Sequence, residues 1–388
     1  MESILLKDII QKPISGEWGL EDLYGTGIPV LRTANFTNEG IINFENVVTR
    51  NISPSKLKGK LLQKGDILLE KSGGSDRQPV GRVVYFDGQA DKYGFNNFTS
   101  ALRISDLTMW NPKYIFYALY ANYHHGGTRK YENKTTGLHN LKVDLFIRSF
   151  SVPYATLIKQ NEIVKKLDLL NHLENVCEVQ LQKLDELIKS RFIEMFGDLI
   201  NEPKYPGIKL GSLGVMITGG TPSRKHDEYY GGNIPFISTP CLESNFISEK
   251  NVQNYLTEAG VKNSATHKIP PYSLMVGNRV GVGRSSINTC EMCTNQDILS
   301  FVDIDTSRFD LLFLKKVIDQ YSPYFDEHKR GATIQGVPSK VIKDSMVPDV
   351  PLEIQKRYTA LVKQSDKSKY REAIFLYLLE DIRICCNI

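Results

Sequence analysis

The stretch "GGNIPFIST" at residues 231–239 repeats the pattern of "GTGIPVLRT" at residues 25–33. Glycine, isoleucine, proline and threonine occupy the same places in both: Gly25 and Gly231, Ile28 and Ile234, Pro29 and Pro235, Thr33 and Thr239. The two stretches lie a whole domain apart, whereas the units of solenoid proteins repeat every roughly 20–50 residues. The repeat therefore predicts a duplicated domain.

Four further pairs of segments follow in the same order, and the offset between partners drifts slowly in one direction, as homologous copies with a few deletions would. These pairs are "GDILLEKSGGSDRQPVGR" (65–82) with "YSLMVGNRVGVGR" (272–284), "NNFTSALRI" (96–104) with "TNQDILSFVDI" (294–304), "TTGLHNLKVDLFIRSFSVP" (135–153) with "ATIQGVPSKVIKDSMVPDVP" (332–351), and "QNEIVKKLDLL" (160–170) with "QKRYTALVKQSD" (355–366). Chance similarity between Gly- and Pro-containing turns could explain one pair but not five.

Each copy has the texture of an α+β fold. Short apolar runs alternate with Gly, Pro and Asn turns, and helices are predicted at "NPKYIFYALYAN" (111–122) and "RFDLLFLKKVID" (308–319). Each copy then runs into a long helix. The predicted boundaries are a first mixed α/β domain at 1–153, a central helix at 154–200, a second mixed domain at 201–350 and a C-terminal helix at 351–388.

The central helix has apolar residues at coiled-coil spacing, interrupted by Glu174 and Arg191. Its seam comprises Ile163, Leu167, Leu170, Cys177, Leu181, Leu184, Ile188 and Met195. The C-terminal helix starts near Leu352, is polar in its middle, and becomes apolar again at "AIFLYLLEDI" (373–382). We expect the two helices to pack as an antiparallel coiled-coil pair, which would give the chain a pseudo-twofold arrangement. The alternative is that both are ordinary core helices of globular domains.

Composition indicates a soluble globular protein. The 388 residues are 41% hydrophobic and 24% charged, with a net charge of +4 that is compatible with a polyanionic partner. No apolar run reaches membrane-spanning length, and the start "MESILLKDII" does not resemble a secretory signal. Six cysteines in a chain of this size do not suggest a disulfide framework. We expect a cytoplasmic protein without a membrane partner.

Four stretches resemble enzyme motifs but lack the necessary context. "NPKY" (111–114) is better explained as an Asn N-cap with Pro at the first helical position. "GNRVGVG" (277–283) is not followed by a phosphate-binding helix, "CEMC" (290–293) has no second ligand pair, and "PDVPLEIQK" (348–356) lacks the spacing of a nuclease site. We expect no catalytic residues, no metal and no cofactor on this chain.

Four segments resemble the specificity subunits of type I restriction–modification systems. They are "RFIEMFGD" (191–198), "GGTPSRKHDEYYGGNIPFIS" (219–238), "GATIQGVPSKVIKD" (331–344) and "VPLEIQKR" (350–357). The resemblance extends over the whole chain through the duplication, although the first copy begins with "KPISGEWG" (12–19) and lacks the Thr-Pro-Ser opening.

The resemblance implies that each mixed domain is a target-recognition domain that reads one half of a bipartite sequence in double-stranded DNA. The two helices would set the spacing between the halves and dock two modification subunits, which carry S-adenosylmethionine. Restriction subunits that use ATP and Mg²⁺ could join. The chain itself would be non-catalytic.

Basic residues in Gly- or Asn-rich loops are the candidate DNA contacts, because arginine and lysine reach phosphates and guanine edges. The candidates are Arg32, Lys71, Arg77, Arg82, Arg129 and Lys130 in the first copy, and Arg224, Lys225, Arg279, Arg284, Lys329 and Arg330 in the second. Each could instead be a solvated surface charge, and the equivalent residues Arg82 and Arg284 could have a structural role.

Two other classes of function stay open on the sequence alone. One is a DNA methyltransferase or nuclease with unrecognised motifs. The other is a coiled-coil adaptor that joins proteins and does not bind DNA.

Overall fold

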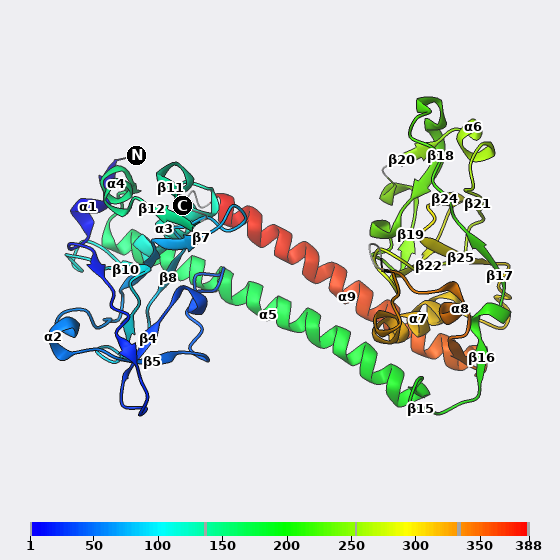
Figure 1. The fold of residues 1–388 in the computed structure, drawn as a ribbon, viewed down its shortest axis with the longest axis horizontal. Helices are drawn as coiled ribbons and strands as arrows, with labels where there is room; N and C mark the ends of the chain where they lie inside the picture. The colour runs from blue at the N-terminus through cyan, green and yellow to red at the C-terminus, as the bar shows by residue number, and fades with distance from the viewer. Residues whose placement is uncertain (1, 136–137, 253, 332–334, 386–388) are drawn as a thin grey trace. The chain divides into compact units, whose positions relative to one another are not determined.

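The computed structural model describes residues 2–135, 138–252, 254–331 and 335–385. The chain divides into two compact units (Figure 1), which are described separately below. Unit 1 comprises Met1–Val176 with Leu376–Ile388, and unit 2 comprises Cys177–Phe375. The long helix that follows the first copy contributes residues to both units.

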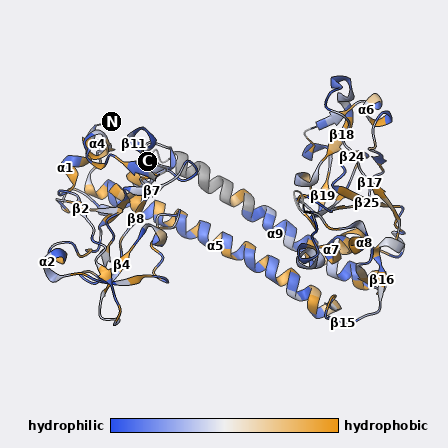
Figure 2. Ribbon diagram, in the orientation of Figure 1, coloured by the Kyte–Doolittle hydropathy of each residue, from blue (hydrophilic) through white to orange (hydrophobic). Residues whose placement is uncertain are grey.

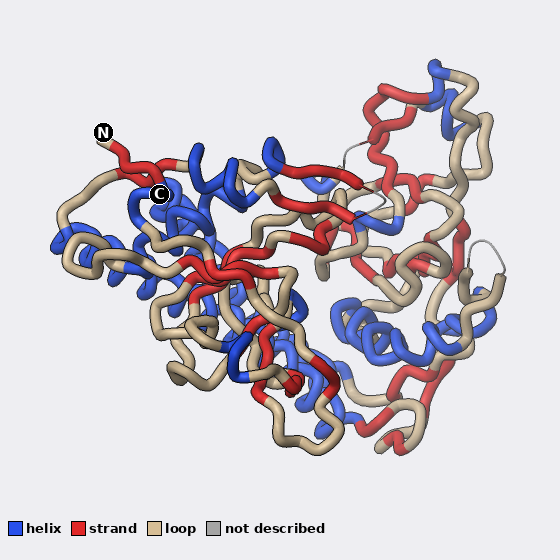
Figure 3. The backbone as a smooth tube through the Cα atoms, turned by 60° about the vertical axis from the view of Figure 1, so that its left-hand side comes forward, coloured by secondary structure: helices blue, strands red, loops and turns tan. Residues whose placement is uncertain are grey.

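Unit 1 is built from short strands separated by long loops (Figure 3). Its strands are β1 (Ser3–Leu5), β2 (Ile14–Ser15), β3 (Leu20–Glu21), β4 (Ile28–Leu31), β5 (Val48–Asn51), β6 (Ile67–Glu70), β7 (Ser72–Gly74), β8 (Val83–Tyr85), β9 (Gly94–Phe95), β10 (Thr99–Leu102), β11 (Glu132–Thr135), β12 (Leu138–Leu141) and β13 (Ser151–Pro153). Its helices are α1 (Leu6–Ile9), α2 (Pro54–Leu57), α3 (Pro112–His124), α4 (Val143–Ser149) and the first part of α5 (Leu157–Phe196).

Unit 2 is likewise built from short strands separated by loops. Its strands are β14 (Gly197–Asp198), β15 (Glu202–Pro203), β16 (Gly207–Lys209), β17 (Val215–Thr218), β18 (Tyr230–Ile237), β19 (Phe246–Ile247), β20 (Asn254–Leu256), β21 (Lys268–Ile269), β22 (Leu274–Gly277), β23 (Ser285–Asn288), β24 (Met292–Thr294), β25 (Ile298–Val302) and β26 (Met346–Pro348). Its helices are α6 (Glu258–Lys262), α7 (Leu311–Glu327), α8 (Ser339–Lys343) and most of α9 (Leu352–Cys385).

The two units share a strand order. One sheet runs β2-β10-β6-β8 in unit 1 and β17-β25-β22-β23-β19 in unit 2, and the pair β1-β13 corresponds to β16-β26. The repeated segments at residues 25–33 and 231–239 contain β4 and most of β18, respectively. Each of these strands pairs antiparallel with one neighbour and parallel with a later strand, β9 or β24. The chain is thus an α+β protein in which one topology occurs twice.

Helices α3 and α7 begin at the residues that their sequences suggest. The side chain of Asn111 caps α3 by accepting from the Lys113 amide, and Pro112 occupies the first turn. Asp310 caps α7 by accepting from the Phe313 amide. The N-cap explanation of the "NPKY" segment is confirmed, and α7 extends eight residues beyond the predicted helix, to Glu327.

Helix α5 is 40 residues long and begins before the predicted seam. Its hydropathy alternates along its length (Figure 2). Within unit 1, Val164, Leu167 and Leu170 pack into a core formed with α3, α4 and the sheet. Of these three, Leu167 and Leu170 belong to the predicted seam, and both contribute to the core of the first domain.

The C-terminal turns of α5 pack in unit 2 through Phe192 and Phe196, both fully buried. The coiled-coil seam predicted from the sequence left out Phe192 and Phe196 but included Met195, which is only half-buried. Arg191 lies outside the core and pairs with Glu194. Gly197, at φ 84°, ends the helix in the left-handed conformation that favours glycine.

Helix α9 begins at Leu352, as predicted, and its first turns belong to the core of unit 2. Tyr358 contacts Phe192 of α5, and further along α9 Lys369 pairs with Asp185. Residue numbers therefore fall on α5 as they rise on α9, so the two helices run antiparallel where they touch within unit 2. The side chains of residues 376–385, in the second apolar stretch of the C-terminal helix, lie outside the described residues.

Two features are absent from the part of the chain that the structure describes. There, no helix is long and apolar enough to cross a bilayer. In the same ranges, no three His, Cys, Asp or Glu side chains are grouped so that they could hold a metal ion.

Candidate nucleic-acid interface

The end of strand β22 forms a polar region of unit 2 beside a cavity. The Asn278 amide donates to the Asp297 carbonyl at 2.9 Å, and the Asn278 carbonyl accepts from the Val337 amide at 2.7 Å. These bonds tie the strand end to the loop before β25 and to the segment that precedes α8. Next to it, the Arg330 and Gly336 backbones bond to each other at 2.8 and 2.9 Å and close the base of the loop between them.

A cavity of about 670 Å³ opens at this strand end, and its wall brings together two of the predicted arginines, Arg279 and Arg330. Thr218, Asn278, Gln296 and Ser339 add polar groups to the wall. The Arg279 guanidinium is half-exposed and lies 3.7 Å from the Asp297 carboxylate. The Asn278 Oδ1 atom is buried and has no hydrogen-bond partner among the described residues. The cavity thus combines cationic donors with amide and hydroxyl groups, the set that contacts phosphates and base edges.

The same strand end recurs in unit 1, where Lys71 takes the place of Asn278. Its amide donates to the Phe98 carbonyl at 2.9 Å, and its carbonyl accepts from the Leu141 amide at 2.8 Å. The Lys71 Nζ atom donates to the Ser15 hydroxyl at 2.8 Å. Burial, together with the charge of Lys60, lowers the pKa of Lys71. Both copies therefore present a polar cluster at the matching strand end.

Arg224 and Lys225 are both exposed on the loop before β18. Arg224 lines a smaller cavity of about 130 Å³ with Tyr230, Ser238 and Asn295. The two residues are adjacent in sequence, but of the two only Arg224 lines this cavity.

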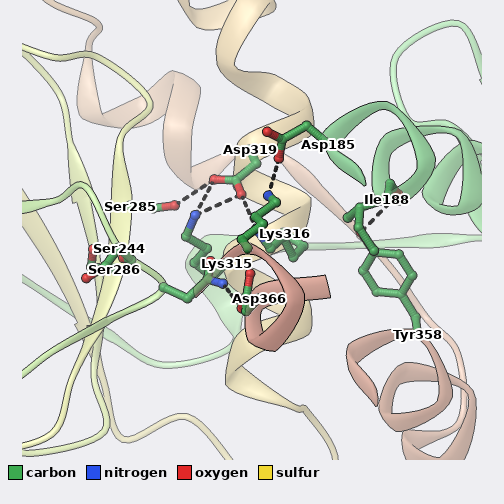
Figure 4. Close-up of polar contacts among 12 residues, drawn as sticks. Asp185, Ile188, Ser244, Ser285, Ser286, Lys315, Lys316, Asp319, Tyr358 and Asp366 are labelled. Carbon is green, nitrogen blue, oxygen red and sulfur yellow. Dashed lines mark hydrogen bonds and ion pairs between the residues drawn. The ribbon is translucent and has the colours of Figure 1, made fainter. Parts of the chain in front are cut away.

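Arg284 is half-exposed and lies 3.6 Å from Glu243, at the rim of a third cavity of about 450 Å³. The floor of this cavity holds a buried ion pair, in which Lys315 Nζ donates to Asp319 at 2.8 Å (Figure 4). The same carboxylate accepts from Ser285 at 3.2 Å. Burial lowers the pKa of Lys315, although the Asp319 charge opposes the shift.

Arg82 does not behave like its sequence partner Arg284. Its guanidinium makes two bonds to the buried Glu70 carboxylate, at 2.9 and 3.0 Å, and also reaches the Phe36 and Thr33 carbonyls. Its side chain is only 12% exposed. Burial opposes its charge, but Glu70 holds the pKa of Arg82 above its usual value. We assign Arg82 to the framework of unit 1 and remove it from the candidate contacts.

The remaining candidates divide by exposure. Arg32 is half-buried, with its Nη2 atom 3.4 Å from the Asn46 carbonyl, and Lys329 is half-buried in an ion pair with Asp326. Arg77, Arg129 and Lys130 are exposed on loops of unit 1. Among the described residues, none of these five lines the three cavities named above.

Sequence reasoning missed the uncharged half of the cavity. Thr218, Asn278 and Gln296 carry no charge, so the pattern of basic residues in loops does not point to them. The repeat could have found Asn278, since its position corresponds to Lys71.

Comparisons with known proteins agree with this architecture. Residues 205–373 match the family described as type I restriction modification DNA specificity domain. A segment of 178 residues is 26% identical to the MjaIX type I restriction enzyme specificity subunit of Methanocaldococcus jannaschii, and covers 44% of this chain and 41% of that protein. A segment of 124 residues is 29% identical to the HindI specificity subunit of Haemophilus influenzae, and covers 32% of this chain and 27% of that protein. The matches thus span less than half the length of these relatives.

Two solved structures share the fold over nearly the whole chain. One is a chain from a study of complex assembly in a type I restriction–modification system, with a TM-score of 0.60, 14% identity and coverage of 99% of this chain and 96% of that one. The other is the type I S subunit from M. genitalium, with a TM-score of 0.61, 12% identity and coverage of 99% and 94%.

Residues 205–373 of unit 2 thus match a type I DNA specificity domain. The chain is similar over these segments to specificity subunits of type I restriction–modification systems, and the resemblance expected from the sequence is confirmed.

Proposed function

We propose that this chain is the DNA sequence-recognition subunit of a type I restriction–modification complex. Residues 1–153 and 201–350, here called the two readers, each contact one half of a bipartite target in double-stranded DNA. The chain catalyses nothing itself. S-adenosylmethionine, ATP and Mg²⁺ belong to partner subunits, and the complex works in the cytoplasm.

The observation that carries this proposal is the polar strand end that occurs once in each unit. Lys71 with Ser15 occupies it in unit 1, and Arg279 and Arg330 flank it in unit 2. Two copies of one contact surface suit a target with two halves. Their different side chains suit two different half-sequences, because base edges are distinguished by the donors and acceptors that face them.

Within the cavity of unit 2, the arginines and the amides have different tasks. Arg279 and Arg330 neutralise phosphates and position the reader. The exposed Gln296 amide offers both a donor and an acceptor, the pattern that pairs with adenine in the major groove, and Asn278 lies beside it in the cavity wall. Substituting the amides changes sequence preference, and substituting the arginines weakens binding to all sequences.

The helices at 154–200 and 351–388 hold the two readers apart. We propose that they pair as an antiparallel coiled coil and relate the two readers by a pseudo-twofold axis. The contacts of Tyr358 and Lys369 of α9 with α5 within unit 2 support this pairing. Two modification subunits dock along the helices, and restriction subunits join the complex through them.

Mapping of methylated adenines in the host genome, with the gene intact and deleted, tests the proposal. Loss of methylation at one bipartite motif on deletion is the expected result. Turnover by the purified chain alone would instead favour an enzyme with unrecognised motifs. If the assembled complex shows no salt-dependent and sequence-selective binding to DNA, the adaptor is favoured.

A further inference from the structure

A buried glutamine joins the first reader to the helix that follows it. Gln160, in the first turn of α5, is fully buried. Its Oε1 atom accepts from the amide of Asn111, the N-cap of α3, at 2.8 Å. Its Nε2 atom donates to the Met109 carbonyl at 3.0 Å and to the Ala155 carbonyl at 2.8 Å. One side chain thus connects the loop before α3, the cap of α3 and the entry to α5.

Gln355 makes the same three bonds in unit 2. It is fully buried in the first turn of α9, and its Oε1 atom accepts from the amide of Asp310, the N-cap of α7, at 2.9 Å. Its Nε2 atom donates to the carbonyls of Arg308 at 3.0 Å and Val350 at 2.9 Å. In both units, one carbonyl comes shortly before the helix cap and the other lies 5 residues before the glutamine.

The geometry of this contact fixes an orientation as well as a position. An apolar side chain in this place could slide or rotate against the reader, because apolar packing has no direction. An amide with an acceptor and two donors engaged in a buried site has only one satisfied arrangement, and leaving any of the three groups unpaired is unfavourable.

A second, different polar contact lies further along each helix. In unit 1, Asp168 of α5 accepts from the Tyr117 hydroxyl and, at 2.8 Å, from Lys113, both on α3. In unit 2, Asp366 of α9 accepts from Asn245 at 2.7 Å (Figure 4). Two polar contacts separated along a helix prevent rotation about either one.

We propose that Gln160 and Gln355 are positioning residues, each of which fixes the rotation of its reader about the following helix and so sets the length of DNA spacer that the subunit accepts. This inference rests on the proposed function. Neither glutamine contacts DNA. A small rotation at the helix start moves the reader's contact surface along or around the duplex, and the tolerated separation between half-targets changes with it.

The test uses the complete complex and a library of DNA molecules in which the two half-targets are separated by spacers of every length around the natural one. Adenine methylation of each molecule is counted by sequencing. The unsubstituted complex favours one spacer length. We expect Gln160→Leu and Gln355→Leu to reduce this discrimination by about tenfold, the size expected when a buried hydrogen bond is removed, without changing either half-sequence.

Two control variants remove equally buried amides that lie within a reader. Asn288→Leu abolishes bonds to Pro270, Cys290 and Ser273 in unit 2, and Asn35→Leu abolishes bonds to Arg32 and Asn43 in unit 1. We expect these variants to lower the melting temperature as much as the glutamine variants do, with an unchanged spacer preference.

Gln160→Asn is a milder variant, because it keeps the uncharged amide but is one methylene too short to reach all three partners at once. It should broaden the spacer preference partly, and the same assay of this variant tests the inference if the leucine variants do not assemble. A folded variant complex with the original sharp spacer preference would overturn the inference. Absence of any bipartite methylation by the unsubstituted complex would instead overturn the proposed function.

Discussion

The ring of Tyr358 on α9 meets the ring of Phe192 on α5 edge-on, with 5.4 Å between ring centroids. Both side chains are fully buried, although 166 residues of sequence separate them. Phe313 of α7 completes the cluster, at 6.2 Å from Phe192. The two long helices and α7 of the second reader therefore share one aromatic core.

Phe192→Ala should destabilise unit 2 by about 3–5 kcal/mol, because it empties a large buried site between three helices. Thermal or denaturant unfolding of the full chain measures the effect. Ile193→Ala, at a neighbouring position that is 49% exposed, is the control and should change stability by less than about 0.5 kcal/mol. Equal effects of the two substitutions would contradict the packing.

Arg279→Ala and Arg330→Ala should each weaken binding of the assembled complex to DNA by about 1.5–3 kcal/mol, since each removes a charged hydrogen-bond donor. The slope of log affinity against log salt should become shallower by about 0.9 for each phosphate that the variant no longer neutralises. Lys268→Ala, which removes a surface ion pair with Glu258, is the matched control. Unaltered affinity and slope in both arginine variants would remove the cavity from the interface.

Arg82→Ala should act on stability rather than on DNA. It leaves the Glu70 carboxylate, only 2% exposed, without its cation, and breaking such a buried pair costs about 3–5 kcal/mol. The double variant with Glu70→Gln should recover part of the stability. A normal melting temperature with a changed target sequence would show instead that Arg82 contacts bases.

Burial raises the pKa of the Cys293 thiol to about 11. Because this value is above that of an unfolded cysteine, the associated stability is fully present below about pH 8.5, the pKa of a free cysteine, and is lost as pH rises through about 11. Alkylation of the native protein at about pH 8, followed by mass spectrometry, should therefore label the partly exposed Cys241 and spare Cys293. Rapid labelling of Cys293 before unfolding would contradict its burial.

The repeat in the sequence was sufficient to predict the α+β texture and the equivalence of Gln160 with Gln355. It was not sufficient to predict what each face of the long helix α5 packs against. Leu167 and Leu170 have coiled-coil spacing, yet they face the first reader, because periodicity reveals an apolar stripe but not what covers it. Phe192 was missed because the predicted seam passes from Ile188 directly to Met195, one heptad later.

The candidate DNA contacts, too, could be predicted from the sequence only in part. Arg279 and Arg330 lie 51 residues apart in sequence, and only the fold brings them to one cavity. Arg82 looked equivalent to Arg284 by alignment, but its partner Glu70 is matched in the second copy by Gly277, which has no carboxylate. The role of an arginine depends on that partner, and alignment of the arginine alone does not reveal it.

Exchange of residues 1–153 for the matching segment of a related subunit tests the central claim most directly. This segment ends with β13, so the pairing of β1 with β13 stays within the exchanged piece. The methylated motif of the hybrid complex should change in one half only, with the other half and the spacer length retained. A change in both halves, or in neither, would contradict the account of two independent readers.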